Sequence, residues 1–81
     1  MHITVRLFAR LRELAGSGEL MREVPAGATV GTIWAALVNE CPELAPYERS
    51  ISCAVNADYS RFTAAVSDGD EVAFLPPVSG G

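Results

Sequence analysis

The feature that most constrains the fold is a single apolar stripe of helical spacing between Thr29 and Pro42. Apolar side chains recur there one helical turn apart, which predicts an amphipathic α-helix with one buried face. Thr29 can cap the start of this helix. Pro42 ends it, because the residue before a proline is disfavoured in the α conformation. The stripe consists of Val30, Ile33, Trp34, Leu37, Val38 and Cys41.

Short strand patterns flank this helix on both sides. Residues 2–8 alternate in polarity, so that Ile3, Val5 and Leu7 share the buried face of a predicted strand. One or two helical turns are expected directly after it, before Gly16. The same reasoning predicts strands over 19–24, 51–56 and 71–75, at most a short strand over 59–62, and a polar connection with at most a single turn over 42–50.

This order of elements predicts an α+β fold in which one main helix covers one face of one mixed sheet. It is the order of the ubiquitin-like β-grasp, with the first and last strands side by side in the middle of the sheet. We expect residues 1–75 to form the β-grasp domain and residues 76–81 an extended C-terminal tail. In the expected core, Val30, Ile33, Trp34, Leu37 and Val38 pack on Val5, Leu7, Val55, Val72 and Phe74.

The composition narrows the classes of function. The net charge is −4 and the six basic residues, all arginines, are scattered along the chain, which argues against a nucleic-acid partner. No apolar run approaches the roughly 18 residues of a membrane span, and no signal-peptide pattern is present, so we expect a cytoplasmic protein. Cys41, Cys53 and His2 lack metal-ligand spacing. We interpret the cysteines as small core residues and expect no bound metal or cofactor.

The sequence finishes with Phe-Leu-Pro-Pro-Val-Ser-Gly-Gly. Pro76 and Pro77 cannot donate hydrogen bonds to a sheet, so the last strand must end before them. Six residues from Pro76 onward reach roughly 20 Å at about 3.3 Å each. Gly80 and Gly81 fit where a Cβ would clash. A frayed terminus is one interpretation. The other is a thin tail whose terminal carboxylate is gripped and converted to an acyl adenylate by an activating enzyme.

Three segments carry a resemblance to a known family. They are Ala-Val-Asn at 54–56, the run Ser-Asp-Gly-Asp-Glu-Val-Ala-Phe-Leu-Pro-Pro-Val-Ser-Gly-Gly at 67–81, and Leu-Phe-Ala-Arg-Leu-Arg-Glu-Leu-Ala-Gly at 7–16. The chain resembles the small subunit of molybdopterin synthase, the MoaD-type sulfur carrier. It departs from the pattern at Leu75, where an aromatic residue is common, and at Ser79, in a slot for a small residue.

The resemblance implies a mechanism centred on Gly81. An enzyme of the ubiquitin-activating type would use ATP and magnesium to adenylate the Gly81 carboxylate. A sulfur donor, ultimately a cysteine desulfurase, would convert it to a thiocarboxylate. The tail would then donate its sulfur to a cyclic pyranopterin in the large synthase subunit, within a heterotetramer of two copies of each subunit. On this view the chain is not an enzyme on its own, because the catalytic groups belong to its partners.

The docking surface is expected beside the root of the tail. Strand alternation puts Leu75 opposite the core-facing Phe74, and Phe8 opposite Leu7, on the face that the helix leaves open. Tyr59 can join them, unless a local bulge turns Phe8 or Leu75 inward. Large apolar residues on an open sheet face indicate a partner. The resemblance adds Arg12, near the activating enzyme, and these tail positions: Pro76, Pro77, Val78, Ser79, Gly80 and Gly81.

Other functions remain open at this stage. The chain could be a ubiquitin-like modifier joined through Gly81 to protein lysines. It could deliver sulfur to the thiazole of thiamine, although those carriers lack the Pro-Pro-Val run. It could also be a passive interaction module that uses its sheet face alone, in which case the loss of Gly81 would be tolerated.

Overall fold

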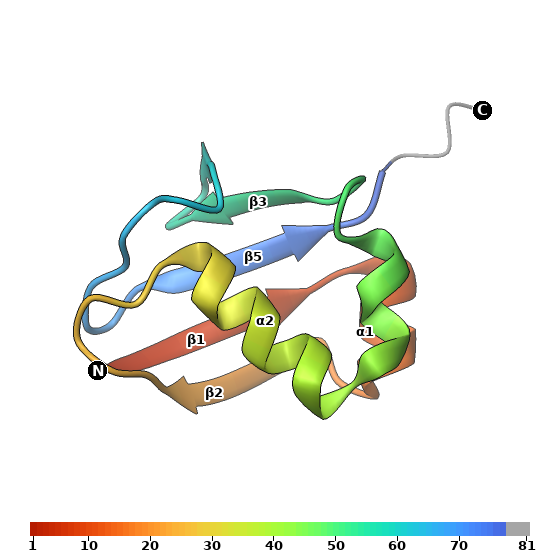
Figure 1. Cartoon of the computed structure of the whole chain (residues 1–81), viewed down its shortest axis with the longest axis horizontal. Helices are drawn as coiled ribbons and strands as arrows, with labels where there is room; N and C mark the ends of the chain where they lie inside the picture. Colours follow the sequence, from red (N-terminus) through yellow and green to blue (C-terminus); the bar gives the residue numbers. More distant parts are fainter. Residues whose placement is uncertain (78–81) are drawn as a thin grey trace.

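Two parallel strands, β1 (His2–Leu7) and β5 (Glu71–Leu75), form the middle of a five-stranded sheet in the computed structural model, which describes residues 1–77. β2 (Glu19–Glu23) pairs antiparallel with β1. On the other side, β3 (Ser52–Val55) pairs antiparallel with β5, and β4 (Asp58–Ser60) with β3. The strand order is β2-β1-β5-β3-β4 (Figure 1). The predicted β-grasp is thereby confirmed, including the central pair.

The long helix α2 (Val30–Glu40) begins and ends as its sequence predicts. The Thr29 hydroxyl accepts from the Thr32 amide at 3.2 Å, and Thr32 caps the Thr29 amide in return. Val30 and Gly31 donate their amides to the carbonyls of residues 64 and 62. These contacts satisfy amides that a helix start otherwise leaves unpaired. They also fix the helix over the sheet by its first turn.

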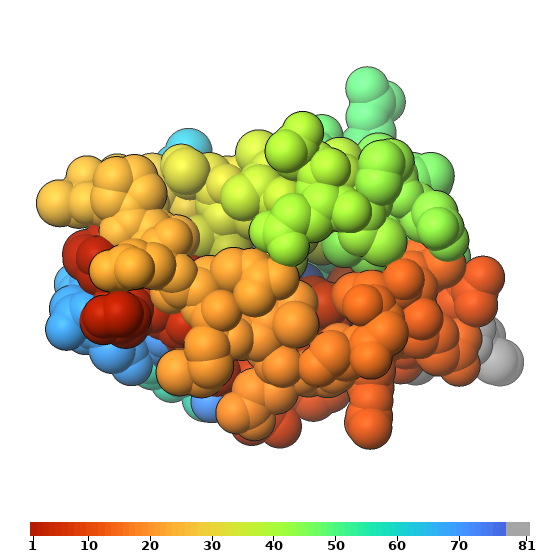
Figure 2. Space-filling view, turned by 90° about the horizontal axis from the view of Figure 1, so that it is seen from below, coloured from red at the N-terminus to blue at the C-terminus, as the bar shows by residue number. Residues whose placement is uncertain are grey.

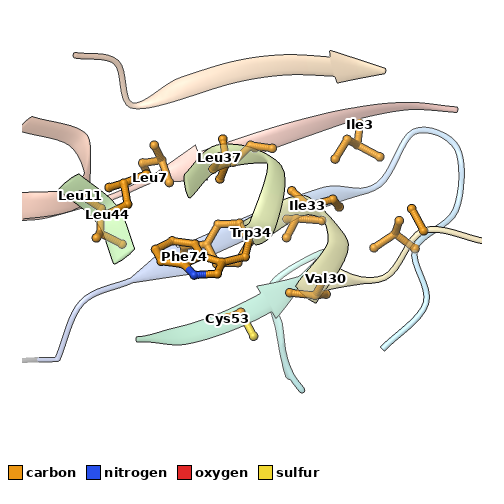
Figure 3. Packing of buried hydrophobic residues seen from close by; sticks show 14 residues of the cluster. Ile3, Leu7, Leu11, Val30, Ile33, Trp34, Leu37, Leu44, Cys53 and Phe74 are labelled. Carbon is orange, nitrogen blue, oxygen red and sulfur yellow. The ribbon is translucent and has the colours of Figure 1, made fainter. Parts of the chain in front are cut away.

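The core lies between α2 and the sheet (Figure 3). Trp34 is its largest side chain, at 1% exposure, and its ring centroid lies 5.1 Å from that of Phe74 on β5. Val5, Leu7 and Val72 are fully buried beneath the helix. Val38 and Val55, which we expected in the core, are half-buried at its margin. The predicted core is otherwise confirmed.

All described helices lie on the same side of the sheet. Leu11 of α1 (Ala9–Ala15) and Leu44 of η1 (Pro42–Tyr47), a short 3₁₀ helix, both belong to the core cluster that α2 covers. Figure 2, seen from the edge of the sheet that β2 forms, shows the yellow and green residues of α2 on one side of the orange residues of β2. Within residues 1–77, the other face has no covering helix, and we call it the open face.

The segment 42–50 differs from its prediction as a polar connection. It contains η1, and Leu44 within it is completely buried. A lone leucine between charged and proline residues has no periodic partner, so hydrophobic periodicity cannot identify it as core. Burial of Leu44 ties the connection to the same core as α1 and α2.

The turn between β3 and β4 is locked to the loop before β5. Asn56 and Ala57 both have positive φ, 50° and 71°, as in a tight two-residue hairpin turn. The Asn56 amide group donates to Asp70 at 2.9 Å, and its carbonyl accepts from the Glu71 amide at 2.9 Å. Hydrogen bonds from Asn56 and from the Ser67 amide lower the pKa of Asp70. These contacts hold the start of β5 in register.

Replacement of Trp34 tests the core. Trp34→Ala should lower the free energy of unfolding by about 3–5 kcal/mol, the range for removing a buried aromatic side chain. The Trp34 indole N–H is buried without an acceptor among the described residues. Trp34→Phe keeps an aromatic ring against Phe74 and removes that unpaired donor, so it should cost clearly less. Urea unfolding followed by circular dichroism checks both, and a near-neutral Trp34→Ala would contradict the assignment of Trp34 as core.

Candidate functional site

The parallel pairing of β1 and β5 creates a defined exit end of the sheet, the end at which β5 finishes at Leu75. Leu7 pairs with Phe74, so β1 finishes at this end too. β3 begins there, with Ser52 opposite Leu75. Pro76 is half-buried and Pro77 exposed directly after the last strand. The predicted tail positions Val78, Ser79, Gly80 and Gly81 lie outside the described residues, and their roles stay predictions.

Phe8 is placed at the exit end by a sharp change of backbone direction. It caps α1 in an extended conformation, and the next residue, Ala9, has a φ of 50° in the left-handed region. The Phe8 side chain is 38% exposed and does not pack against the core. The guanidinium carbon of Arg6 lies 5.7 Å from its ring centroid. A cation–π contact at such an exposed site contributes about 0.5–1 kcal/mol and restrains the ring without covering it.

Leu75 and Tyr59 also lie on the open face. Leu75 is half-buried and is not part of the core cluster, whereas its neighbour Phe74 is. Tyr59 is 80% exposed on the edge strand β4, two strands away from β5. Small side chains lie between Leu75 and Tyr59, because Tyr59 pairs with Ala54 of β3 and Ala54 pairs with Ala73 of β5. The predicted outward orientation is therefore present, without an inward bulge at Phe8 or Leu75.

Met21 extends this surface and was missed by the sequence reasoning. It is 66% exposed on β2, opposite Thr4, whose hydroxyl donates to the Met21 sulfur at 3.3 Å. Leu20 pairs with the core-facing Val5, so Met21 must point the other way. Strand alternation could have found it. Met21, Phe8 and Tyr59 are the exposed large hydrophobic residues of the described chain, and all belong to the open face or its rim.

Arg12 borders a groove beside Phe8. The groove has a volume of about 380 Å³. The Arg12 side chain lies across Gly18, where an added Cβ would come within 3.0 Å of its Cδ. No carboxylate of the described residues lies within salt-bridge distance of Arg12, whereas Arg6 is 3.7 Å from Glu71. The Arg12 guanidinium in this groove is therefore available to pair with an acidic group of a partner. Its lining comprises Arg6, Leu7, Phe8, Arg12, Ser17, Gly18 and Glu19.

The two thiols are held inside the fold. Cys53 is buried and donates to the Ser60 carbonyl at 3.0 Å, and burial raises the pKa of its thiol. Cys41 is half-buried and donates to the Leu14 carbonyl at 3.5 Å. Within residues 1–77, no three histidine, cysteine or acidic side chains gather as metal ligands would. No described helix is long and apolar enough to cross a membrane.

The arrangement of the described residues suits docking. It offers an exposed apolar surface, an adjacent arginine and a rigid strand that ends beside both. None of these groups is a nucleophile paired with a base. The docking roles of Phe8, Tyr59, Leu75 and Arg12 stay predictions.

Comparison with known proteins adds independent information. The model of the ThiS family matches residues 5–81. The chain is 39% identical to the molybdopterin synthase sulfur carrier subunit of Chlamydomonas reinhardtii, with all of both chains covered. It is 38% identical to the protein of the same name from Arabidopsis thaliana, covering 100% of this chain and 84% of that one. The crystal structure of SAMP1 from Haloferax volcanii, a small archaeal modifier protein, is 35% identical, covers both chains fully and superposes with a TM-score of 0.86. The chain belongs to the ThiS family.

Proposed function

We propose that this protein is the sulfur carrier subunit of a molybdopterin synthase. The observation that carries the proposal is similarity over the full length to proteins of that name, together with the Gly80-Gly81 end of the sequence. The Gly81 carboxylate is adenylated, converted to a thiocarboxylate and used to donate sulfur to a cyclic pyranopterin. Two such donations build the dithiolene of molybdopterin.

In this proposal the chain presents a reactive end and its partners supply the catalysis. An activating enzyme with bound ATP and magnesium forms the adenylate, and a donor such as a cysteine desulfurase provides the sulfur. The large synthase subunit binds the pyranopterin, in an assembly with two copies of each subunit. The protein itself needs no bound cofactor. Its contribution is a rigid exit strand, an open face for docking and a tail without bulky side chains at its tip.

The geometry of the open face supports one docking surface for both partners. Leu75 and Phe8 lie at the exit end, where any partner that grips the tail must approach. Apolar anchors close to the centre of an interface carry most of its binding energy. If both partners use these residues, the activating enzyme and the large subunit compete for the carrier.

A second function, protein modification through Gly81, is favoured by the similarity to the archaeal modifier protein. It would use the same activated glycine and replace the sulfur acceptor by a protein lysine. A ladder of conjugates on denaturing gels, dependent on Gly81, would support it. A passive interaction module would show neither thiocarboxylate nor conjugates.

Three variants of the chain's end test the chemistry. Deleting Gly81 draws the carboxylate back by about 3.3 Å, and a displacement of even about 1 Å can cost about 100-fold in rate. Gly81→Ala places a Cβ beside the reacting carbon and should be severely impaired. A residue added after Gly81 turns its carboxylate into an amide and should block activation. The measurement is thiocarboxylation by the activating enzyme with ATP and a sulfide source, followed by intact mass.

The three variants should keep the circular dichroism spectrum and partner affinity of the unchanged protein, because the described core ends at Phe74. Full activity of the extended variant without proteolytic trimming would contradict the sulfur-carrier function.

Leu75→Asp tests the shared docking surface. A charge at the centre of an apolar interface should abolish binding to both the large subunit and the activating enzyme. Ala35→Asp is the matched control, because Ala35 is exposed on α2, on the opposite side of the molecule. Binding is measured by calorimetry with each partner. Normal affinity of Leu75→Asp for either partner would show that the two do not share this surface.

Gly18→Ala tests the position of Arg12. An added Cβ would lie 3.0 Å from the Arg12 Cδ, so the Arg12 side chain must shift by a few tenths of an ångström. If Arg12 pairs with an acidic group of the activating enzyme, Arg12→Gln should weaken that complex by about fivefold, as expected for a partly exposed pair worth about 1 kcal/mol, and Gly18→Ala should weaken it by a smaller factor. Loss of affinity in Arg12→Gln alone would mean that Gly18 does not position the arginine.

A further inference from the structure

Once Gly81 is adenylated as proposed, nucleophilic groups of the same protein can attack it. A glycyl adenylate is a mixed anhydride, which amines and thiols attack at the carbonyl carbon. A second copy of the chain, or the chain itself, therefore competes with the intended acceptor. Hydroxyl groups compete poorly, because they need a neighbouring base to become nucleophilic.

Side-chain amines contribute nothing to this competition. None of the 81 residues is a lysine, and the six residues of the lysine and arginine class are all arginines: Arg6, Arg10, Arg12, Arg22, Arg49 and Arg61. A guanidinium stays protonated at any physiological pH and has no free electron pair to offer. A lysine at the same positions would carry a neutral, nucleophilic fraction.

The α-amino group of Met1 is held at the far end of the sheet. Its ammonium donates to the Val24 carbonyl at 2.7 Å, and the next residue, His2, donates its amide to Asp68 at 2.6 Å. Because β1 and β5 are parallel, Met1 lies at the opposite end from Leu75 (Figure 1). The amine is thus both hydrogen-bonded and remote from the exit end.

Both thiols also donate hydrogen bonds to backbone carbonyls. Cys53 is 5% exposed with its S–H directed to the Ser60 carbonyl, and Cys41 is half-buried with its S–H directed to the Leu14 carbonyl. A thiol must lose its proton to attack, and burial of Cys53 opposes this loss.

We propose that the chain is a donor-only carrier: it has no lysine, and within residues 1–77 the Met1 ammonium and both thiols are engaged in hydrogen bonds, so that no free amine or thiol is offered to the activated glycine of another copy. This inference rests on the proposed function. In the reaction that is prevented, an amine nitrogen bonds to the Gly81 carbonyl carbon, the C–O bond to AMP breaks, and AMP and one proton leave. If the protein also modifies other proteins, each acceptor site then carries one copy and no chain of copies.

The test introduces a lysine amine at the exit end of the sheet, where the tail begins. Arg49 and Arg61 are exposed at the exit end, since Arg49 precedes β3 and Arg61 follows β4. Arg49→Lys and Arg61→Lys keep the charge and add an amine. Arg49→Gln and Arg61→Gln are the matched controls without one. Each protein is incubated with the activating enzyme, ATP and magnesium without a sulfur donor, and the pyrophosphate released by adenylation is measured.

The products are then treated with a thiol reductant, which removes thioesters and leaves amides, and are weighed intact. The unchanged protein and the glutamine variants should keep the mass of one free chain. The lysine variants should gain a species lighter by one water, or a two-chain species lighter by one water. Thiol-resistant adducts of the unchanged protein, or lysine variants that release pyrophosphate and remain unmodified, would overturn the inference. Absence of pyrophosphate release from the unchanged protein would instead overturn the proposed function on which the inference depends.

Discussion

The parallel pairing of β1 with β5 is the contact on which the rest of this structure depends. It brings the first and last strands of the chain together in the middle of the sheet, with Leu7 opposite Phe74. Phe74 is completely buried under Trp34, so the last strand is anchored in the core up to the residue before the chain leaves the sheet. The same pairing sends the start of the chain to the opposite end.

In our proposal, this anchoring explains how a small protein takes part in chemistry that its partners catalyse. The fold fixes the point at which Pro76 and Pro77 leave the sheet, and Phe8 and Leu75 lie on the open face next to it. Because reaction rates depend steeply on the position of the reacting atom, a fixed starting point for the tail would favour the reaction. In our proposal the partners bind this root and complete the reaction.

Much of the fold could be predicted because local signals agreed with one another. The α2 stripe, its Thr29 cap and the proline after it define a single helix, and one helix can cover only one face of the sheet. Leu44 was missed because an isolated leucine in a short 3₁₀ helix has no periodic pattern. Met21 was missed because Arg22 shares the inner side of β2 with Leu20 and obscures the alternation. The Arg22 guanidinium forms an ion pair with Glu40 of α2 at 2.8 Å, which compensates its charge on that side of the strand.

Only part of the candidate site could be predicted from the sequence. Alternation correctly placed Phe8 and Leu75 outside the core, since a strand leaves each side chain only two directions. The Arg12–Gly18 contact joins a helix to a loop and has no signature in the sequence. The chemistry of Gly81 was predicted from the terminal motif and the family resemblance, and it stays a proposal because Gly81 lies outside the described residues.

The central claim is that Gly81 carries sulfur in the cell, and the most direct test is the intact mass of the protein isolated from its own organism. Cells lacking the large synthase subunit are the best source, because the thiocarboxylate would form there without being consumed. Our account predicts a major species in which one oxygen is replaced by sulfur, localised to Gly81 by fragmentation and absent when the activating enzyme is removed. A protein that carries only an ordinary carboxylate in those cells, while the activating enzyme is present and active, would contradict it.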